Sequence, residues 1–531
     1  GNLKLFDFVV ANPPFSTKSW SNGFDPEHDL YNRFEYGIPP KRNGDYAFVL
    51  HILSSMKSTG KGAIVMPHGV LFRGNAEEEI RCNLIIKGYI KGVISLPPNL
   101  FYGTGIPACI LLLDKEHAGT RKGIFMVDAS QGYMKDSAKN RLRHQDIRKI
   151  VDIFNGKIEI PAYSRLVPYD EIRENGYNLN IPRYIDNSEP EVIQDIEAHL
   201  RGGIPNRDIE ALYDFWSVFQ SLKNELFEPS DRYGYSELKV NPEGIRKVIE
   251  DNAEYQDFFN EVDHRITQWW TDAQPLIEAL DKDTIPKEFI DTISERLLVS
   301  FEDLPLINKY DVYQQLMDYW TETMQDDVYM IAQEGWVANS DLIPHDLIAE
   351  HYYSEILNEI IVLENELENI SNQMQEMKEE HGGEECPFEN VKSEARNITK
   401  GALKKRLKEI EDDNEYSEEF AILSSYQDLD NKLTSIKSQI RDLERTLKEK
   451  SMMRYSQLQE EEINKIIESK WKINLQSGFT KIINQILFDF INYLEQIINL
   501  YSIPLKSYEE STIKLTKKVQ NHLHEMGFEW K

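Results

Sequence analysis

Short apolar runs alternate with helix-like patterns along the first 130 residues. Four runs are almost wholly apolar, as is typical of strands buried on both faces of a sheet: residues 6–11, 62–66, 93–96 and 108–113. Between the first two runs, residues 45–56 show a helical pattern. Asn75 stands at the expected N-cap of a second helix, with Glu78 at the capping-box position. This alternation predicts an α/β sheet that closes near residues 180–184.

From about residue 190 the strand pattern ends, and apolar residues recur at helical spacing. Within residues 356–377, and again within 422–447, they step by four and three, which is the heptad pattern of a coiled coil. A charged, glycine-containing stretch separates the two seams, so they can fold back as an antiparallel helical hairpin. We therefore predict a long all-α region with a coiled-coil hairpin after the sheet. The predicted divisions are a sheet domain at 1–186, a helical region at 187–350, a coiled-coil arm at 351–450 and C-terminal helices at 451–531.

Charge is distributed unevenly between these divisions. The 531 residues include 60 basic and 90 acidic ones; residues 1–190 hold 24 and 21 of them, and the remainder 36 and 69. An acidic surface does not bind a phosphate backbone by itself, whereas the near-neutral first part can. The three cysteines match neither a disulfide framework nor a metal site, so we expect a cytoplasmic protein without a metal. The most apolar stretch, 482–500, contains two acidic residues and is not predicted to span a membrane.

The segment with a chemical signal is Asn12-Pro13-Pro14-Phe15, directly after the first predicted strand. The Asn12 amide oxygen and the Pro13 carbonyl can accept hydrogen bonds from an exocyclic amine and draw its lone pair out of conjugation. Consecutive prolines stiffen the turn and preorganise the acceptors, and Phe15 offers a ring on which an extruded base can stack. The alternative is a proline turn that merely ends a strand. The preceding strand favours function, because ligands of α/β sheets bind beyond strand carboxyl ends.

With four further segments, this motif resembles the amino-methylating DNA adenine methyltransferases, and within them the modification subunits of type I restriction–modification systems. The further segments are residues 44–48, 66–74, 96–107 and 175–184. The resemblance implies a Rossmann-like catalytic domain that uses S-adenosylmethionine to make N6-methyladenine in double-stranded DNA. It also implies a specificity subunit that reads the DNA and a restriction subunit as partners. In that family the motif is catalytic, so the catalytic role carries over to Asn12, Pro13, Pro14 and Phe15.

One feature departs from the family pattern. The family's glycine-rich cofactor loop and its ribose-binding acid precede the catalytic motif, whereas eleven residues precede Asn12 here. We therefore expect an incomplete methyltransferase sheet in an N-terminally truncated fragment that alone neither binds S-adenosylmethionine well nor methylates DNA. Residues 101–105 are glycine-rich, but they lead into a predicted strand rather than a helix. We interpret them as a strand-to-strand loop near the target base.

Several other residues have both a functional and a structural interpretation. Phe101, Tyr102 and Gly103 can flank a flipped base, although loop aromatics just as often fill the edge of a core. Asp45 is explained by its place at a helix start, and a cofactor-binding role for it rests on the resemblance alone. His68 is interpreted as a structural loop histidine.

The basic stretch 115–149 and the heptads also leave alternatives open. Arg141, Arg143, Arg148 and Lys149 are candidate DNA contacts, or else a solvated helix face. The hairpin either packs only on itself or docks a partner. A hypothesis from a different class is therefore a non-catalytic helical assembly module that docks a specificity subunit, with the Asn-Pro-Pro-Phe segment silent.

Overall fold

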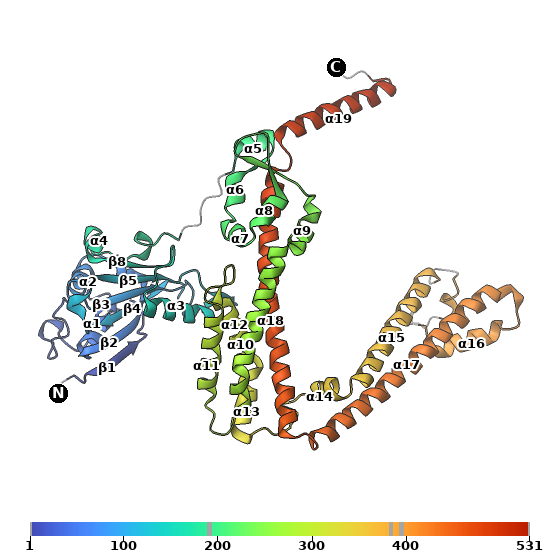
Figure 1. The fold of residues 1–531 in the computed structure, drawn as a ribbon, viewed down its shortest axis with the longest axis horizontal. Coiled ribbons are helices and arrows are strands. Elements are labelled where there is room, and N and C mark those ends of the chain that lie inside the picture. The colour runs from blue at the N-terminus through green and yellow to red at the C-terminus, as the bar shows by residue number, and fades with distance from the viewer. Residues whose placement is uncertain (1–2, 103, 188–193, 382–385, 392–397, 529–531) are drawn as a thin grey trace. The chain divides into compact units, whose positions relative to one another are not determined.

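The computed structural model describes residues 3–102, 104–187, 194–381, 386–391 and 398–528 (Figure 1). These residues form two compact units. The first comprises Gly1–Arg265, Ser294–Asp318 and Phe479–Lys531, and the second Ile266–Ile293 and Tyr319–Gly478. The four divisions expected from the sequence stay a prediction.

A six-stranded mixed sheet in the order β1-β2-β4-β3-β5-β8 forms the centre of the N-terminal part. Its strands are β1 (Phe6–Ala11), β2 (Met56–Pro67), β3 (Ile90–Ser95), β4 (Ala108–Asp114), β5 (Gly123–Asp128) and β8 (Ser164–Pro168). β1 pairs parallel with β2 and β3 with β5, whereas β4 is antiparallel to β2 and β3, and β8 to β5. The carboxyl ends of β1, β2, β3 and β5 therefore lie at one edge of the sheet, which we call the carboxyl edge.

Helices cover both faces of the central strands, because successive side chains of a strand point to opposite faces. Val93 and Met126 join a core with α1 (Asp45–Ser54) and α2 (Ala76–Ile86). Ile94 and Phe125, their neighbours in sequence, join a second core with α3 (His144–Gly156). The predicted α/β sheet buried on both faces is therefore present at β3 and β5.

The prediction that residues 6–11 form a buried strand is only half right. β1 is a strand, but Phe8 is 74% exposed and Val10 is 80% exposed. β1 lies at the edge of the sheet, and the core on the α3 face is centred on β3 and β5. The predicted capping box also needs correction. α2 does begin after Asn75, but Asn75 has a φ of 57° and its side chain does not cap the helix.

The remaining elements of the first 187 residues are short. They are the hairpin β6 (Met134–Asp136) and β7 (Lys139–Arg141), and helix α4 (Tyr169–Glu174). β5, β6, β7 and β8 were not predicted. The residues after α4 return to the first core, because Leu179, Ile181 and Tyr184 are buried in it.

The expectation that strands end near residue 190 is wrong. A three-stranded sheet in the order β10-β11-β9 is built from β9 (Ile204–Pro205), β10 (Phe227–Pro229) and β11 (Tyr235–Leu238). These strands contain two to four residues, which is too short for an alternating pattern to show.

Helices make up the rest of the described chain. They are α5 (Ile196–Arg201), α6 (Asn206–Glu210), α7 (Tyr213–Val218), α8 (Gln220–Leu226), α9 (Ile245–Asp251), α10 (Ala253–Glu278), α11 (Pro286–Ser300), α12 (Lys309–Tyr319), α13 (Gln325–Glu334), α14 (His345–Tyr352), α15 (Ser354–Glu380), α16 (Lys400–Ile410), α17 (Ser417–Tyr455), α18 (Glu460–Tyr501) and α19 (Leu505–Glu525). Within the described residues, none of these helices is long and apolar enough to cross a membrane.

The two predicted heptad seams fall on α15 and α17, which lie side by side in the second unit (Figure 1). Ile370 and Met374 of α15 share a buried core with Leu423, Tyr426 and Ile436 of α17. Side chains of α16 complete this core. The expected hairpin of packed helices is therefore present, and its coiled-coil geometry stays a prediction.

Candidate functional site

The Asn-Pro-Pro-Phe segment leaves β1 at the carboxyl edge of the sheet. Asn12 and Pro14 are exposed, whereas Pro13 and Phe15 are half-buried. Among the described residues, neither the Asn12 side-chain amide nor the Pro13 carbonyl has a hydrogen-bond partner. Two acceptors from adjacent residues are therefore available to a ligand at the end of the strand.

The structure brings Phe15 together with Phe101, which belongs to the loop between β3 and β4. Their ring centroids are 5.7 Å apart and the rings meet edge to face at 75°. Tyr102 is 94% exposed beside them, and Gly103, the third predicted member of a base pocket, lies outside the described residues. The glycine-rich segment 101–105 connects two antiparallel strands, so its interpretation as a strand-to-strand loop is correct.

The loop that carries Phe101 is held by the hairpin β6–β7. Lys139 Nζ donates to the Phe101 carbonyl at 2.9 Å and to the Thr104 carbonyl at 3.3 Å. Asn140 Nδ2 donates to the Pro98 carbonyl at 2.7 Å. We did not predict this role for Lys139 and Asn140. Lys139 belongs to the basic stretch, where sequence alone presents it as one more surface charge.

Asp45 begins α1, as predicted, but it is only 1% exposed. Its Oδ1 accepts a hydrogen bond from the backbone N–H of Ser16 at 2.7 Å, and its Oδ2 accepts one from Arg73 Nη1 at 2.7 Å. Arg73 Nη1 also lies 3.3 Å from Glu77 Oε1. Burial raises the pKa of the Glu77 carboxyl, and the Arg73 guanidinium opposes that rise. Each oxygen of Asp45 thus accepts a hydrogen bond from the chain itself, and the cofactor-binding role stays a prediction.

Further polar side chains gather at the carboxyl edge. His68 follows β2, and its Nε2 lies 3.0 Å from Ser95 Oγ at the end of β3. Burial lowers the pKa of His68, which favours the neutral ring. Asp128, at the end of β5, accepts a hydrogen bond from Asn187 Nδ2 at 2.7 Å. His68 is thus a partnered loop histidine. Within the described ranges, no three His, Cys, Asp or Glu side chains are grouped so as to hold a metal ion.

The four candidate DNA contacts have different surroundings. Arg141 is exposed; its Nη2 contacts the Met134 sulfur at 3.5 Å, and it has no acidic partner in the part of the chain that the structure describes. The other three are engaged by neighbouring side chains: Arg143 by Asp146, Arg148 by Asp152 and Glu295, and Lys149 by the ring of Tyr163. Of these four candidates, Arg141 therefore has the positive charge that is most available to a phosphate.

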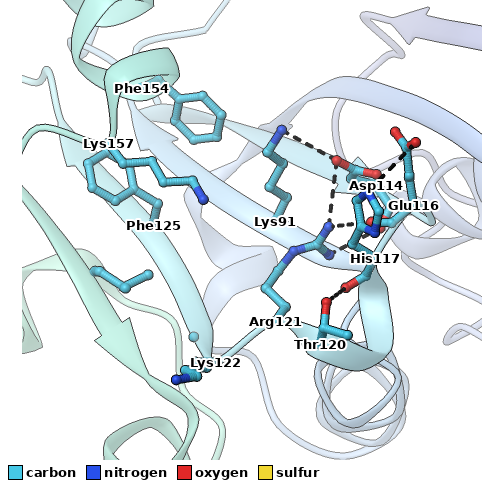
Figure 2. Close-up of a pocket in the computed structure, with 12 residues that line it drawn as sticks. Lys91, Asp114, Glu116, His117, Thr120, Arg121, Lys122, Phe125, Phe154 and Lys157 are labelled. Carbon is cyan, nitrogen blue, oxygen red and sulfur yellow. Dashed lines mark hydrogen bonds and ion pairs between the residues drawn. The ribbon is translucent and has the colours of Figure 1, made fainter.

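A cavity of about 420 Å³ lies at the other edge of the sheet, where β3 and β5 begin and β4 ends (Figure 2). Lys91 Nζ and Arg121 Nη2 lie 3.3 and 3.5 Å from Asp114 Oδ2, and Figure 2 shows both side chains directed at this carboxylate. The rings of Phe125 and Phe154 line the same cavity. Because it opens at the strand ends opposite to Asn12, this cavity is separate from the candidate site.

The first part of the chain is similar to DNA methylases. Residues 2–192 match the family model described as N-6 DNA Methylase. The type I restriction enzyme MpnII methylase subunit of Mycoplasma pneumoniae is 38% identical over 194 residues, which are 36% of this chain and 35% of that protein. The MjaVII methylase subunit of Methanocaldococcus jannaschii is 35% identical over 204 residues, which are 36% of this chain and 35% of that protein. A solved type I methyltransferase subunit from Streptococcus thermophilus is 38% identical, covers 35% of this chain and 39% of that chain, and has a TM-score of 0.32.

The chain spans about a third of the length of the curated relatives that it matches. Its family match begins before β1 and ends after the buried segment that follows α4, so it contains the motif, the loop of Phe101 and Asp45. Residues 2–192 therefore match the N-6 DNA methylase family, and the resemblance to the modification subunits of type I restriction–modification systems, predicted from the motifs, is confirmed.

Proposed function

We propose that this chain is part of the modification subunit of a type I restriction–modification complex, a site-specific DNA methyltransferase that methylates N6 of a flipped adenine. The observation that carries the proposal is the pair of acceptors on Asn12 and Pro13, which have no partner in the described chain and lie beside the Phe15–Phe101 pair. The names of the relatives, which are methylase subunits, support it.

The geometry suits the chemistry of an aromatic amine. The N6 lone pair of adenine is delocalised into the ring, so the amine is a weak nucleophile. Hydrogen bonds from its two N–H groups to Asn12 Oδ1 and the Pro13 carbonyl hold it in place and favour a localised lone pair. The same acceptors stabilise the positive charge that develops on N6 as it takes up a methyl group, before the nitrogen loses a proton to solvent. Phe15 supplies a ring face for the base outside the duplex.

In this family S-adenosylmethionine supplies the methyl group, but the described residues do not present a complete site for it. Both oxygens of Asp45 are bound by Ser16 and Arg73, and the glycine-rich segment 101–105 joins two strands instead of leading into a helix. We propose that this 531-residue polypeptide binds S-adenosylmethionine weakly and does not methylate DNA alone. Calorimetric titration of the chain tests this, and micromolar affinity would contradict it.

Double-stranded DNA is the proposed substrate, and Arg141 is the proposed phosphate contact. Replacing Arg141 by Ala in the complete enzyme is expected to weaken binding equally on all DNA sequences and to lower the slope of log affinity against log salt by about one. Arg173, an exposed arginine of α4, provides the control. An unchanged salt slope for the Arg141 variant would assign it to a solvated surface.

Docking of a specificity subunit is a second candidate function, and a restriction subunit is the further proposed partner. The observation that favours docking is α19, whose apolar side chains Leu515 and Val519 are exposed. Leu515→Asp is expected to abolish co-purification with the specificity subunit, whereas Val362→Asp on an exposed face of α15 is not. Equal co-purification of both variants would remove α19 from the interface.

The catalytic proposal is tested by tritium transfer to DNA from labelled S-adenosylmethionine, in the complete modification enzyme that contains this chain. Asn12→Ala removes one preorganised acceptor and is expected to lower the rate of transfer by roughly 100-fold or more. Asn22→Ala, an exposed asparagine in the loop after the motif, is the matched control. Digestion of the product should place the label in N6-methyladenine. Wild-type transfer by the Asn12 variant, or label in another base, would refute the proposal.

A further inference from the structure

The segment after the motif is fastened to the start of α1. Gly44 N–H donates to the Thr17 carbonyl at 2.9 Å, and the indole Nε1 of Trp20 donates to the Pro40 carbonyl at 2.9 Å. The hydrogen bond nearest to the motif is that from Ser16 N–H, directly after Phe15, to Asp45 Oδ1. Ser16 has a φ of 52°, a left-handed conformation that costs energy for a residue other than glycine. Asp45 accepts a hydrogen bond from the N–H of this strained residue.

Asp45 is in turn held from its other side. Its Oδ2 accepts from Arg73 Nη1, which also lies between Asp45 and the buried carboxylate of Glu77. A Cβ atom on Gly69 would lie 2.4 Å from Arg73 Nε, so an alanine at this position would require the Arg73 guanidinium to shift from its place beside Asp45. A buried carboxylate that is bound on both oxygens, by a backbone N–H and by a guanidinium, has little freedom to rotate.

We infer that Asp45 is a positioning residue for methyl transfer: together with Arg73, it fixes the turn after Phe15 and so sets where the Asn12 and Pro13 acceptors stand. The motif is held at both ends, by β1 before Asn12 and by the hydrogen bond from Ser16 to Asp45 after Phe15. With both ends fixed and two prolines between them, the four-residue segment has few conformations. This inference rests on the proposed function, because it names the residue that preorganises the same acceptors.

A positioning role for Asp45 predicts different experimental results from a role in cofactor binding or in general stability. If Asp45 only stabilised the fold, a variant that folds would transfer methyl groups normally. If it positions the motif, a folded variant binds DNA normally but transfers slowly, because a displacement of about 1 Å of a reacting group can cost roughly 100-fold in rate. An asparagine at this position can accept from Ser16 or from Arg73 but not satisfy both, so it should retain more activity than alanine.

Hydrogen exchange on the 531-residue chain provides the first test, because it needs no activity. Asp45→Asn and Asp45→Ala are expected to accelerate exchange in peptides that cover residues 12–24, and to leave β3 and β5 protected. Gly69→Ala, which displaces Arg73 without touching the loop, should produce the same local acceleration. The control is Asp114→Asn, because Asp114 is also a buried carboxylate and pairs with Lys91 and Arg121 at the other edge of the sheet.

Single-turnover methylation by the complete enzyme provides the second test. We expect the transfer rate to fall by roughly 10- to 100-fold for Asp45→Asn and further for Asp45→Ala, with DNA affinity within about twofold of wild type. Should the Asp45 variants unfold, Gly69→Ala decides the question with the same two readouts. Unaltered exchange over residues 12–24, or a wild-type transfer rate with Asp45→Ala, would overturn the inference. A wild-type enzyme that never methylates adenine would instead refute the proposed function, while the exchange result would still stand.

Discussion

Arg81 provides the sharpest prediction about stability, because its guanidinium is buried and donates hydrogen bonds to three backbone carbonyls. It is 1% exposed, and it donates to the carbonyls of Tyr177 at 2.8 Å, Arg73 at 2.9 Å and Val70 at 3.1 Å. The Tyr46 hydroxyl also donates to the Val70 carbonyl, at 2.7 Å. Arg81 thus joins the segment after α4, which returns to the core, to α2 and to the turn that presents Arg73.

Replacing Arg81 by Met keeps most of the buried side-chain volume but removes every donor. The Val70 carbonyl keeps the Tyr46 hydroxyl, so two carbonyls, those of Tyr177 and Arg73, lose this donor. An unsatisfied buried group costs about 1–3 kcal/mol, and these two hydrogen bonds are partly buried, so the loss is at most roughly 2–6 kcal/mol of unfolding free energy. Arg81→Lys should recover only part of this, because a single ammonium does not reproduce the planar fork of arginine.

Hydrogen exchange at increasing urea concentration measures this loss of unfolding free energy in peptides of β2 and α2, and so separates the six-stranded sheet from the helices that follow it in the chain. Arg173→Met is the control, since Arg173 is exposed and its ion pair with Asp170 lies at the surface. A loss below about 1 kcal/mol for Arg81→Met, no larger than that of the control, would show that water or relaxation replaces these hydrogen bonds and would refute the reasoning.

Three further predictions concern other parts of the chain. Leu423→Ala leaves a cavity at a fully buried position of α17 and should lower the unfolding free energy, measured by hydrogen exchange in that helix, by about 2–5 kcal/mol. The exposed control Val362→Ala should lower it by about 0.5 kcal/mol or less. Lys470→Met removes the cation 2.7 Å from buried Asp327 and should cost about 3–5 kcal/mol at neutral pH. That loss should shrink on acidification, because burial already raises the pKa of Asp327 and its protonated form needs no cation; an equal loss at both pH values would contradict this. Burial lowers the pKa of His68 below 6.5. The contribution of His68 to the free energy of unfolding is therefore complete above pH 6.5 and is lost as pH falls through the lowered pKa. His68→Gln should reduce this loss of stability at acidic pH, as measured by urea titrations.

Local sequence patterns predict those strands and helices whose formation depends mainly on residues close together in the sequence. The predicted strands at residues 62–66 and 108–113 lie inside β2 and β4, and the predicted strand at 93–96 overlaps β3, because continuous apolar runs of this length have few alternatives. The place of Asn12 at a strand end followed from the same signal. An apolar run, however, looks alike in a central and in an edge strand, so the exposure of Phe8 and Val10 in β1 was not predictable from it.

The parts that were missed depend on contacts between distant residues. Lys139 is 38 residues from Phe101, and Asp45 is 29 residues from Ser16, so no spacing in the sequence indicates either hydrogen bond. A lysine in a basic stretch predicts a solvent-exposed charge, and an aspartate at a helix start is explained by the helix dipole. Only the pairing of β3 with β4 and of β6 with β7 brings the Lys139 ammonium to the loop of Phe101.

The exposed edge strand β1 has a practical consequence for work with this polypeptide. A strand that has one hydrogen-bonded neighbour among the described residues, and apolar side chains such as Phe8 and Val10 open to solvent, is a template for adding another strand. The isolated chain is therefore expected to self-associate through β1 as its concentration rises. Light scattering over a dilution series should accompany every titration, and a charged replacement such as Val10→Lys offers a means of keeping the material monodisperse.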